Sequence, residues 1–87
     1  MTYSIEISRD ALRTLAKLDK PVRRRLQTAI DRLRDDPLPR GAVALKGLAG
    51  AYRVRAGDYR IVYTVDNGRL VVVVVDLGHR REIYRDL

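Results

Sequence analysis

The feature that most constrains the fold is segment 51–84, which reads AYRVRAGDYRIVYTVDNGRLVVVVVDLGHRREIY and has the periodicity of a β-meander. Apolar and polar residues alternate along 51–55 and 58–65, and the run from 69 to 77 is rich in valine. Ala56-Gly57 and Asn67-Gly68 separate these runs and are typical of tight hairpin turns. The pattern predicts three antiparallel strands, and the valines predict that the third is buried on both faces.

The first half of the chain predicts a strand followed by two helices. Residues 3–7 alternate like a strand, and Ser8 is suited to cap a helix from Arg9 to about Leu18. Pro21 fits the first position of a second helix that ends near residue 35. The short connection between them favours an antiparallel helical hairpin. Segment 36–50 holds prolines and glycines and is predicted to be a loop.

These elements predict an α+β fold in which the helices pack on one face of the meander. The 87 residues suit a single domain spanning 1–87. The chain has no cysteine, which excludes disulfides and Cys-based zinc sites, and we expect no metal and no cofactor. The start of the chain does not resemble a signal peptide and no apolar run could span a bilayer. We therefore expect a cytoplasmic protein without a membrane partner.

The formal net charge of +7 favours a negatively charged partner. With a turn at Ala56-Gly57, Arg53 would stand directly opposite Arg60, and Arg55 would share their face. Like charges on neighbouring strands cost stability, so this face predicts a phosphate ligand. An alternative is that the arginines serve only solubility and protection of the sheet edge.

The sequence offers little for catalysis besides this basic face. It has no paired acids, no phosphate-binding glycine loop, and no serine or cysteine beside its histidine. RNA carries its own nucleophile, the 2′-hydroxyl, so arginines that stabilise the charged transition state could suffice for cleavage. His79 is the side chain whose ordinary pKa suits proton transfer near neutral pH, whereas arginine is a poor general base. Tyr84 could stack on a base or pack on a final strand at residues 82–84.

The order of strand, helical hairpin and basic meander ending in GHRREIY resembles the RelE superfamily of bacterial toxins from type II toxin–antitoxin systems. The resemblance covers nearly the whole chain, including LKGLAGAY before the meander. It implies an endoribonuclease, or mRNA interferase, that cuts messenger RNA in the ribosomal A site through the substrate's 2′-hydroxyl, without a metal. It also implies a cognate RelB-like antitoxin in a hetero-oligomeric complex.

The resemblance assigns roles to individual residues. The predicted catalytic residues are Arg60, His79, Arg80 and Tyr84, and the predicted substrate-binding residues are Lys46, Arg53, Arg55 and Arg81. Which of Arg80 and Arg81 faces the phosphate stays open. Two other functions also stay open: inhibition of DNA gyrase, as in ParE-type toxins of the same fold, and binding to RNA or the ribosome without cleavage.

Overall fold

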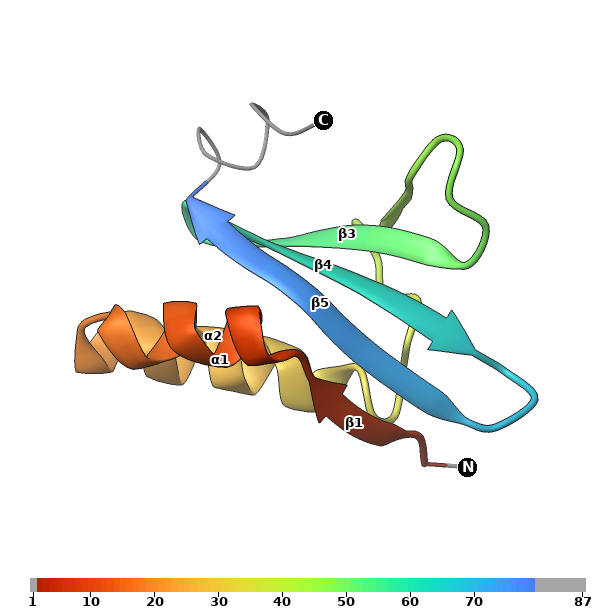
Figure 1. Cartoon of the computed structure of the whole chain (residues 1–87), viewed down its shortest axis with the longest axis horizontal. Helices are drawn as coiled ribbons and strands as arrows, with labels where there is room; N and C mark the ends of the chain where they lie inside the picture. Colours follow the sequence, from red (N-terminus) through yellow and green to blue (C-terminus); the bar gives the residue numbers. More distant parts are fainter. Residues whose placement is uncertain (1, 80–87) are drawn as a thin grey trace.

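The computed structural model describes residues 2–79 and has two layers, a mixed sheet and a helical hairpin that covers one of its faces (Figure 1). The elements are β1 (Ser4–Ile7), α1 (Arg9–Lys17), α2 (Lys20–Arg32), β2 (Val43–Ala44), β3 (Ala51–Ala56), β4 (Tyr59–Asp66) and β5 (Val71–His79). The predicted α+β fold with helices packed against a meander is confirmed. Neither helix in the described part is long and apolar enough to cross a membrane.

The sheet has five strands in the order β1-β5-β4-β3-β2. The three predicted meander strands form its centre, and two edge strands extend it. β1 pairs with β5 in parallel, which the sequence did not specify. β2 lies within segment 36–50, where we expected only a loop, and pairs with β3 through Val43 and Ala44. The meander is therefore framed by one parallel and one antiparallel neighbour.

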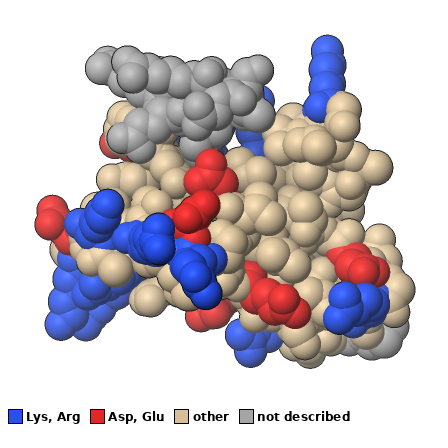
Figure 2. Space-filling view, in the orientation of Figure 1, with Lys and Arg blue, Asp and Glu red and all other residues tan. Residues whose placement is uncertain are grey.

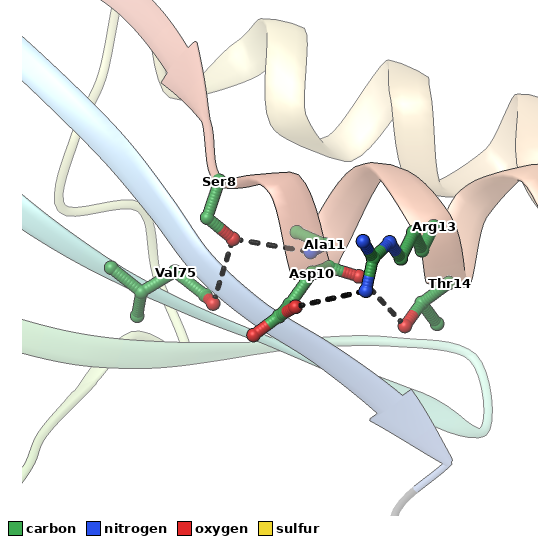
Figure 3. Close-up of polar contacts among 6 residues, drawn as sticks. All are labelled: Ser8, Asp10, Ala11, Arg13, Thr14 and Val75. Carbon is green, nitrogen blue, oxygen red and sulfur yellow. Dashed lines mark hydrogen bonds and ion pairs between the residues drawn. The ribbon is translucent and has the colours of Figure 1, made fainter.

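The start of α1 is held by Ser8, as its sequence position predicts (Figure 3). The hydroxyl oxygen of Ser8 accepts a hydrogen bond from the Ala11 amide at 3.1 Å. The same hydroxyl donates to the carbonyl oxygen of Val75 at 3.0 Å. This side chain thus caps a helix and joins it to β5. The second helix begins one residue before Pro21, after Asp19, and ends at Arg32, earlier than expected.

The core lies between the hairpin and the sheet. It consists of buried apolar side chains from both layers: Ala11, Leu15, Leu26, Ile30, Leu33, Ile61, Tyr63, Val72, Val74 and Leu77. Tyr63 is fully buried, and its hydroxyl donates to the Pro37 carbonyl at 2.8 Å. Burial, together with the nearby Tyr52 and Asp36, raises the pKa of Tyr63 to about 12. A core tyrosine therefore fastens the segment after α2 to β4.

The predicted pairing of β3 with β4 was wrong by two residues. Gly57 and Asp58 form the turn instead of Ala56 and Gly57, so Arg55 and not Arg53 stands opposite Arg60. Gly57 has a φ of +63°, the left-handed region that favours glycine. Because the shift is an even number of residues, every side chain keeps its predicted face.

The predicted pairing of β4 with β5 was also wrong. Their connection spans residues 67–70, so β5 begins at Val71 and not at residue 69. The ladder then contains a bulge, because Tyr63 pairs with Val74 whereas Val62 pairs with Asp76. The bulged residue is Val75. As a result Arg60 pairs with Gly78 and not with Val75.

The valine-rich strand is buried on one face only, which corrects the expectation of burial on both. Val72 and Val74 are fully buried against the helices, whereas Val75 is 38% exposed. Val71 and Val73, on the other face, are half-buried. Among residues 2–79 the helices cover a single face of the sheet (Figure 1).

Candidate nucleic-acid interface

The sheet face opposite the helices carries three predicted site residues, and we call it the arginine face: Arg53, Arg55 and Arg60. Arg53 and Arg55 alternate along β3 with inward-facing residues, and Arg60 lies on the neighbouring strand. Cross-strand partners share a face, and Arg55 pairs directly with Arg60. Arg55 is exposed, Arg53 and Arg60 are half-buried, and the Nε atom of Arg60 is buried. The structure thus brings three guanidinium groups to one side of two adjacent strands.

The neighbours on β5 shape this face. Gly78 pairs with Arg60 and presents no side chain opposite it. Asp76 pairs with Val62, which in turn pairs with Arg53. A carboxylate therefore lies on the arginine face, in the cross-strand row next to that of Arg55 and Arg60. The Asp76 carboxylate accepts a hydrogen bond from the Leu77 amide at 2.9 Å. Sequence reasoning missed Asp76, because only the bulge brings it to this face.

Lys46 lies next to the arginine face. An open groove of about 320 Å³ is lined by Val43, Ala44, Leu45, Lys46, Leu48 and Arg53. Val43 pairs with Arg53, and both Val43 and Leu48 are largely exposed. The structure therefore brings Lys46 together with Arg53 beside the edge strand β2. The groove combines two positive charges with apolar side chains.

His79 lies elsewhere. It pairs with Tyr59, whose side chain faces the helices, and the two rings meet edge to face with centroids 5.6 Å apart. Together with Thr14, Lys17 and Leu18 they line a pocket of about 300 Å³ under α1. The structure thus places His79 on the opposite side of the sheet from Arg60 and does not bring these two predicted catalytic side chains together.

The remaining predicted site residues, Arg80, Arg81 and Tyr84, lie outside the described residues, as does the possible strand at 82–84. Within residues 2–79, no three His, Cys, Asp or Glu side chains gather in a way that could hold a metal ion. The arrangement of arginines is suited to bind phosphate, because guanidinium groups make bidentate, charge-assisted hydrogen bonds to its oxygens.

Comparisons with known proteins agree with this architecture. Residues 5–84 match the family described as the ParE toxin of the type II toxin–antitoxin system parDE. The chain is 33% identical to the toxin RelG of Mycobacterium tuberculosis (strain ATCC 25618 / H37Rv), covering 98% of this chain and 99% of RelG. It is 30% identical to the mRNA interferase toxin RelE of Escherichia coli (strain K12), covering 99% and 94%.

A solved structure extends the comparison to three dimensions. A chain of the archaeal RelE–RelB complex from Pyrococcus horikoshii OT3 superposes with a TM-score of 0.82 at 33% identity, covering 92% of this chain and 97% of that one. The family match spans most of the chain, and the relatives named here carry RelE or RelG names. The chain therefore belongs to the RelE/ParE superfamily of type II toxin–antitoxin toxins, in its RelE-like branch.

Proposed function

We propose that this toxin is a ribosome-dependent endoribonuclease that cleaves messenger RNA in the A site and so inhibits translation. The observation that carries the proposal is the direct pairing of Arg55 with Arg60, with Arg53 on the same face. Like charges on neighbouring strands repel each other, and guanidinium groups gathered in this way are well suited to bind a phosphate anion. The E. coli relative at 30% identity is named an mRNA interferase, which supports RNA as that anion.

The proposed chemistry uses the substrate's own nucleophile. The 2′-hydroxyl loses its proton and attacks the adjacent phosphorus, the bond to the 5′-oxygen breaks, and that oxygen takes up a proton. The products are a 2′,3′-cyclic phosphate and a 5′-hydroxyl. Arg60, at the centre of the sheet, stabilises the negative charge of the pentavalent transition state. Arg53, Arg55 and Lys46 hold the flanking phosphates and orient the strand.

Proton transfer is proposed for residues at the end of β5 and beyond. From the family resemblance, Arg80 and Tyr84 contribute to catalysis and Arg81 to substrate binding. His79 reaches the reaction only if its ring leaves the pocket beside Tyr59, so we propose that it contributes less than Arg60. The reaction as proposed needs no metal, because the substrate supplies the nucleophile and the arginines supply the positive charge. Toxin dialysed against a chelator should therefore cleave as fast as untreated toxin.

Primer extension on a defined messenger RNA programmed into ribosomes tests the proposal. Wild type should produce one cut in the A-site codon, and Arg60→Ala should reduce the rate by roughly 10²- to 10³-fold, as loss of one preorganised charge donor does. Arg24→Ala, which removes an exposed arginine of α2, should cleave like wild type. His79→Gln should lose less than Arg60→Ala.

Primer extension, together with a ribosome-binding measurement and a DNA supercoiling assay, separates the alternatives. Near-wild-type cleavage by Arg60→Ala would refute the assigned site. Ribosome binding without any cut by folded wild type would indicate a binding module. Inhibition of DNA supercoiling with intact messenger RNA would indicate a gyrase inhibitor, which the RelE and RelG names of the relatives do not favour.

We further propose that a cognate RelB-like antitoxin binds this toxin in a hetero-oligomer. The P. horikoshii relative was solved in complex with RelB, and the net charge of +7 suits an acidic partner. Co-expression with a candidate antitoxin followed by size-exclusion chromatography tests this, and separate elution of the two proteins would contradict it. A cytoplasmic location follows from the proposed ribosomal target.

A further inference from the structure

A second group of arginines lies where α2 meets the turn between β3 and β4. It lines an open groove of about 310 Å³, which we call the α2 groove: Arg25, Thr28, Ala29, Arg32, Arg55, Ala56 and Gly57. The four α2 residues are spaced i, i+3, i+4 and i+7, so they form one stripe of the helix. The groove is lined by three arginines and a hydroxyl, and no acidic side chain lines it.

The turn lies against two of these arginines. The Nε–H of Arg55 donates to the Gly57 carbonyl oxygen at 3.2 Å, which leaves both terminal nitrogens of Arg55 outside this bond. A Cβ atom at Gly57 would lie 3.0 Å from Nη1 of Arg25, so that side chain would have to move by a few tenths of an ångström. The absence of a side chain at Gly57 therefore lets the guanidinium group from α2 lie against the turn.

The charges in the α2 groove are not balanced by ion pairs among residues 2–79. The two ion pairs there join Arg13 with Asp10 and Arg34 with Asp31, and neither includes an arginine of the groove. Asp58 follows Gly57 in the turn but does not line the groove. Figure 2 shows blue side chains over the helical hairpin on the left of the view, with red side chains beside them; α1 lies in front of α2 in this orientation.

From this geometry we infer that the α2 groove binds a backbone phosphate of RNA. Three arginines and the Thr28 hydroxyl offer the donors that a phosphate accepts, and arginine binds phosphate with two parallel hydrogen bonds. The other lining residues, Ala29, Ala56 and Gly57, are small. A volume of about 310 Å³ lies at the lower end of the range for ligand pockets, roughly 300–1,000 Å³.

Arg55 links the α2 groove to the arginine face, because it belongs to both. An RNA strand whose phosphates contact Arg60 could therefore pass Arg55 at the β3–β4 turn and continue towards α2, because single-stranded nucleic acids follow positively charged grooves. Arg25 and Arg32 would then be positioning residues that bind RNA without touching the reacting phosphate. This inference rests on the proposed RNA substrate, but it concerns binding and is tested without cleavage.

Binding measurements test the inference with two sources of RNA phosphate, a single-stranded oligoribonucleotide and ribosomes without messenger RNA. The test variant is Arg25→Ala/Arg32→Ala, and the control is Arg13→Ala/Arg24→Ala, which removes the same charge from exposed positions outside the groove. We expect the test variant to weaken binding about five- to tenfold. The plot of log affinity against log salt should become less steep by about 0.7 for each lost contact to single-stranded RNA.

The arms of the experiment separate the possible results. If the test variant loses affinity for the oligoribonucleotide, the bound phosphate belongs to the substrate RNA. If it loses affinity only for ribosomes without messenger RNA, the phosphate belongs to ribosomal RNA. Either result supports phosphate binding by the α2 groove. Arg25→Lys/Arg32→Lys, which keeps the charge without the bidentate fork, should bind with intermediate affinity. In cleavage assays the alanine variant should raise KM and leave kcat nearly unchanged.

Two results would overturn the inference. One is an equal loss of affinity in the test and control variants, which would show a general charge effect. The other is absence of binding by wild type in both arms. If binding depends on the groove as expected but wild type never cuts messenger RNA, only the proposed function fails. Circular dichroism should confirm that both exposed double variants remain folded.

Discussion

Replacing Arg55 with threonine is expected to stabilise the folded toxin while weakening its binding to RNA. Arg55 and Arg60 are direct cross-strand neighbours, so their Cβ atoms lie roughly 5 Å apart. Opposite charges in such a pair contribute about 0.2–1 kcal/mol, whereas like charges are destabilising, and we take their cost to be of the same order. Threonine removes this repulsion and is well suited to a strand.

The expected gain is small but measurable. The substitution also removes the exposed hydrogen bond from Arg55 to the Gly57 carbonyl, and this loss offsets part of the stability gained by removing the charge repulsion. We estimate a net increase in the free energy of unfolding of about 0.5 kcal/mol, which in a domain of this size raises Tm by roughly 2–4 °C. Urea unfolding at low and high salt measures it. The gain should disappear near 1 M salt, where the screening length falls to about 3 Å.

Two control variants separate the local repulsion from other effects. Arg55→Lys keeps the positive charge and should give little or no gain. Arg24→Gln removes one positive charge elsewhere on the surface and should report the effect of net charge alone. A loss of stability in Arg55→Thr at low salt, or a gain that persists unchanged at 1 M salt, would refute the view that the arginine face is held at a cost to the fold.

Two further predictions concern the fold that carries the site. The pKa of Tyr63 is raised from 10.0 to about 12 in the folded protein, so the unfolded chain loses this proton first as the pH rises. The free energy of unfolding should therefore fall by roughly 2–3 kcal/mol between about pH 10 and 12. Tyr63→Phe should abolish this pH-dependent loss and should cost about 1 kcal/mol at neutral pH, because it removes the hydrogen bond to the Pro37 carbonyl. Ser8→Ala should lower the free energy of unfolding by about 1–2 kcal/mol in thermal unfolding, because it removes both the helix cap on the Ala11 amide and the hydrogen bond to the Val75 carbonyl. Ser8→Asp keeps only the acceptor of the helix cap and should recover part of this loss.

The sequence predicted the elements well where periodicity and capping agree. The alternation around Arg53 and Arg60, the turn glycines and the Ser8 cap each follow from local chemistry, so the hairpin and meander could be placed without tertiary information. The exact pairing could not, because Ala56-Gly57 and Gly57-Asp58 are both acceptable turns. That ambiguity changed the partners of the arginines but not their face, which is why the arginine face was predicted correctly from an incorrect register.

The edge strands and the α2 groove had no comparable signal. Val43 and Ala44 form a strand too short to show alternation, and they pair only because β3 presents an open edge. The parallel pairing of β1 with β5 joins residues about 67 positions apart, which no local pattern reports. Arg25 and Arg32 look like ordinary exposed helix residues in the sequence, and only the packing of α2 beside Gly57 brings them to Arg55.

The position of His79 shows how one bulged residue can decide a site. If the register that pairs Tyr63 with Val74 continued without a bulge, Arg60 would pair with Leu77, and His79 would lie on the arginine face. The bulge at Val75 instead pairs Leu77 with Ile61, which turns Leu77 into the core at 3% exposure and carries His79 to the helix-covered side. Burying a leucine stabilises a fold by about 1.5–3 kcal/mol, so packing alone favours this arrangement. If the proposed cleavage takes place on the ribosome, we therefore expect the proton donors and acceptors at the arginine face to come from residues after His79 or from the ribosome.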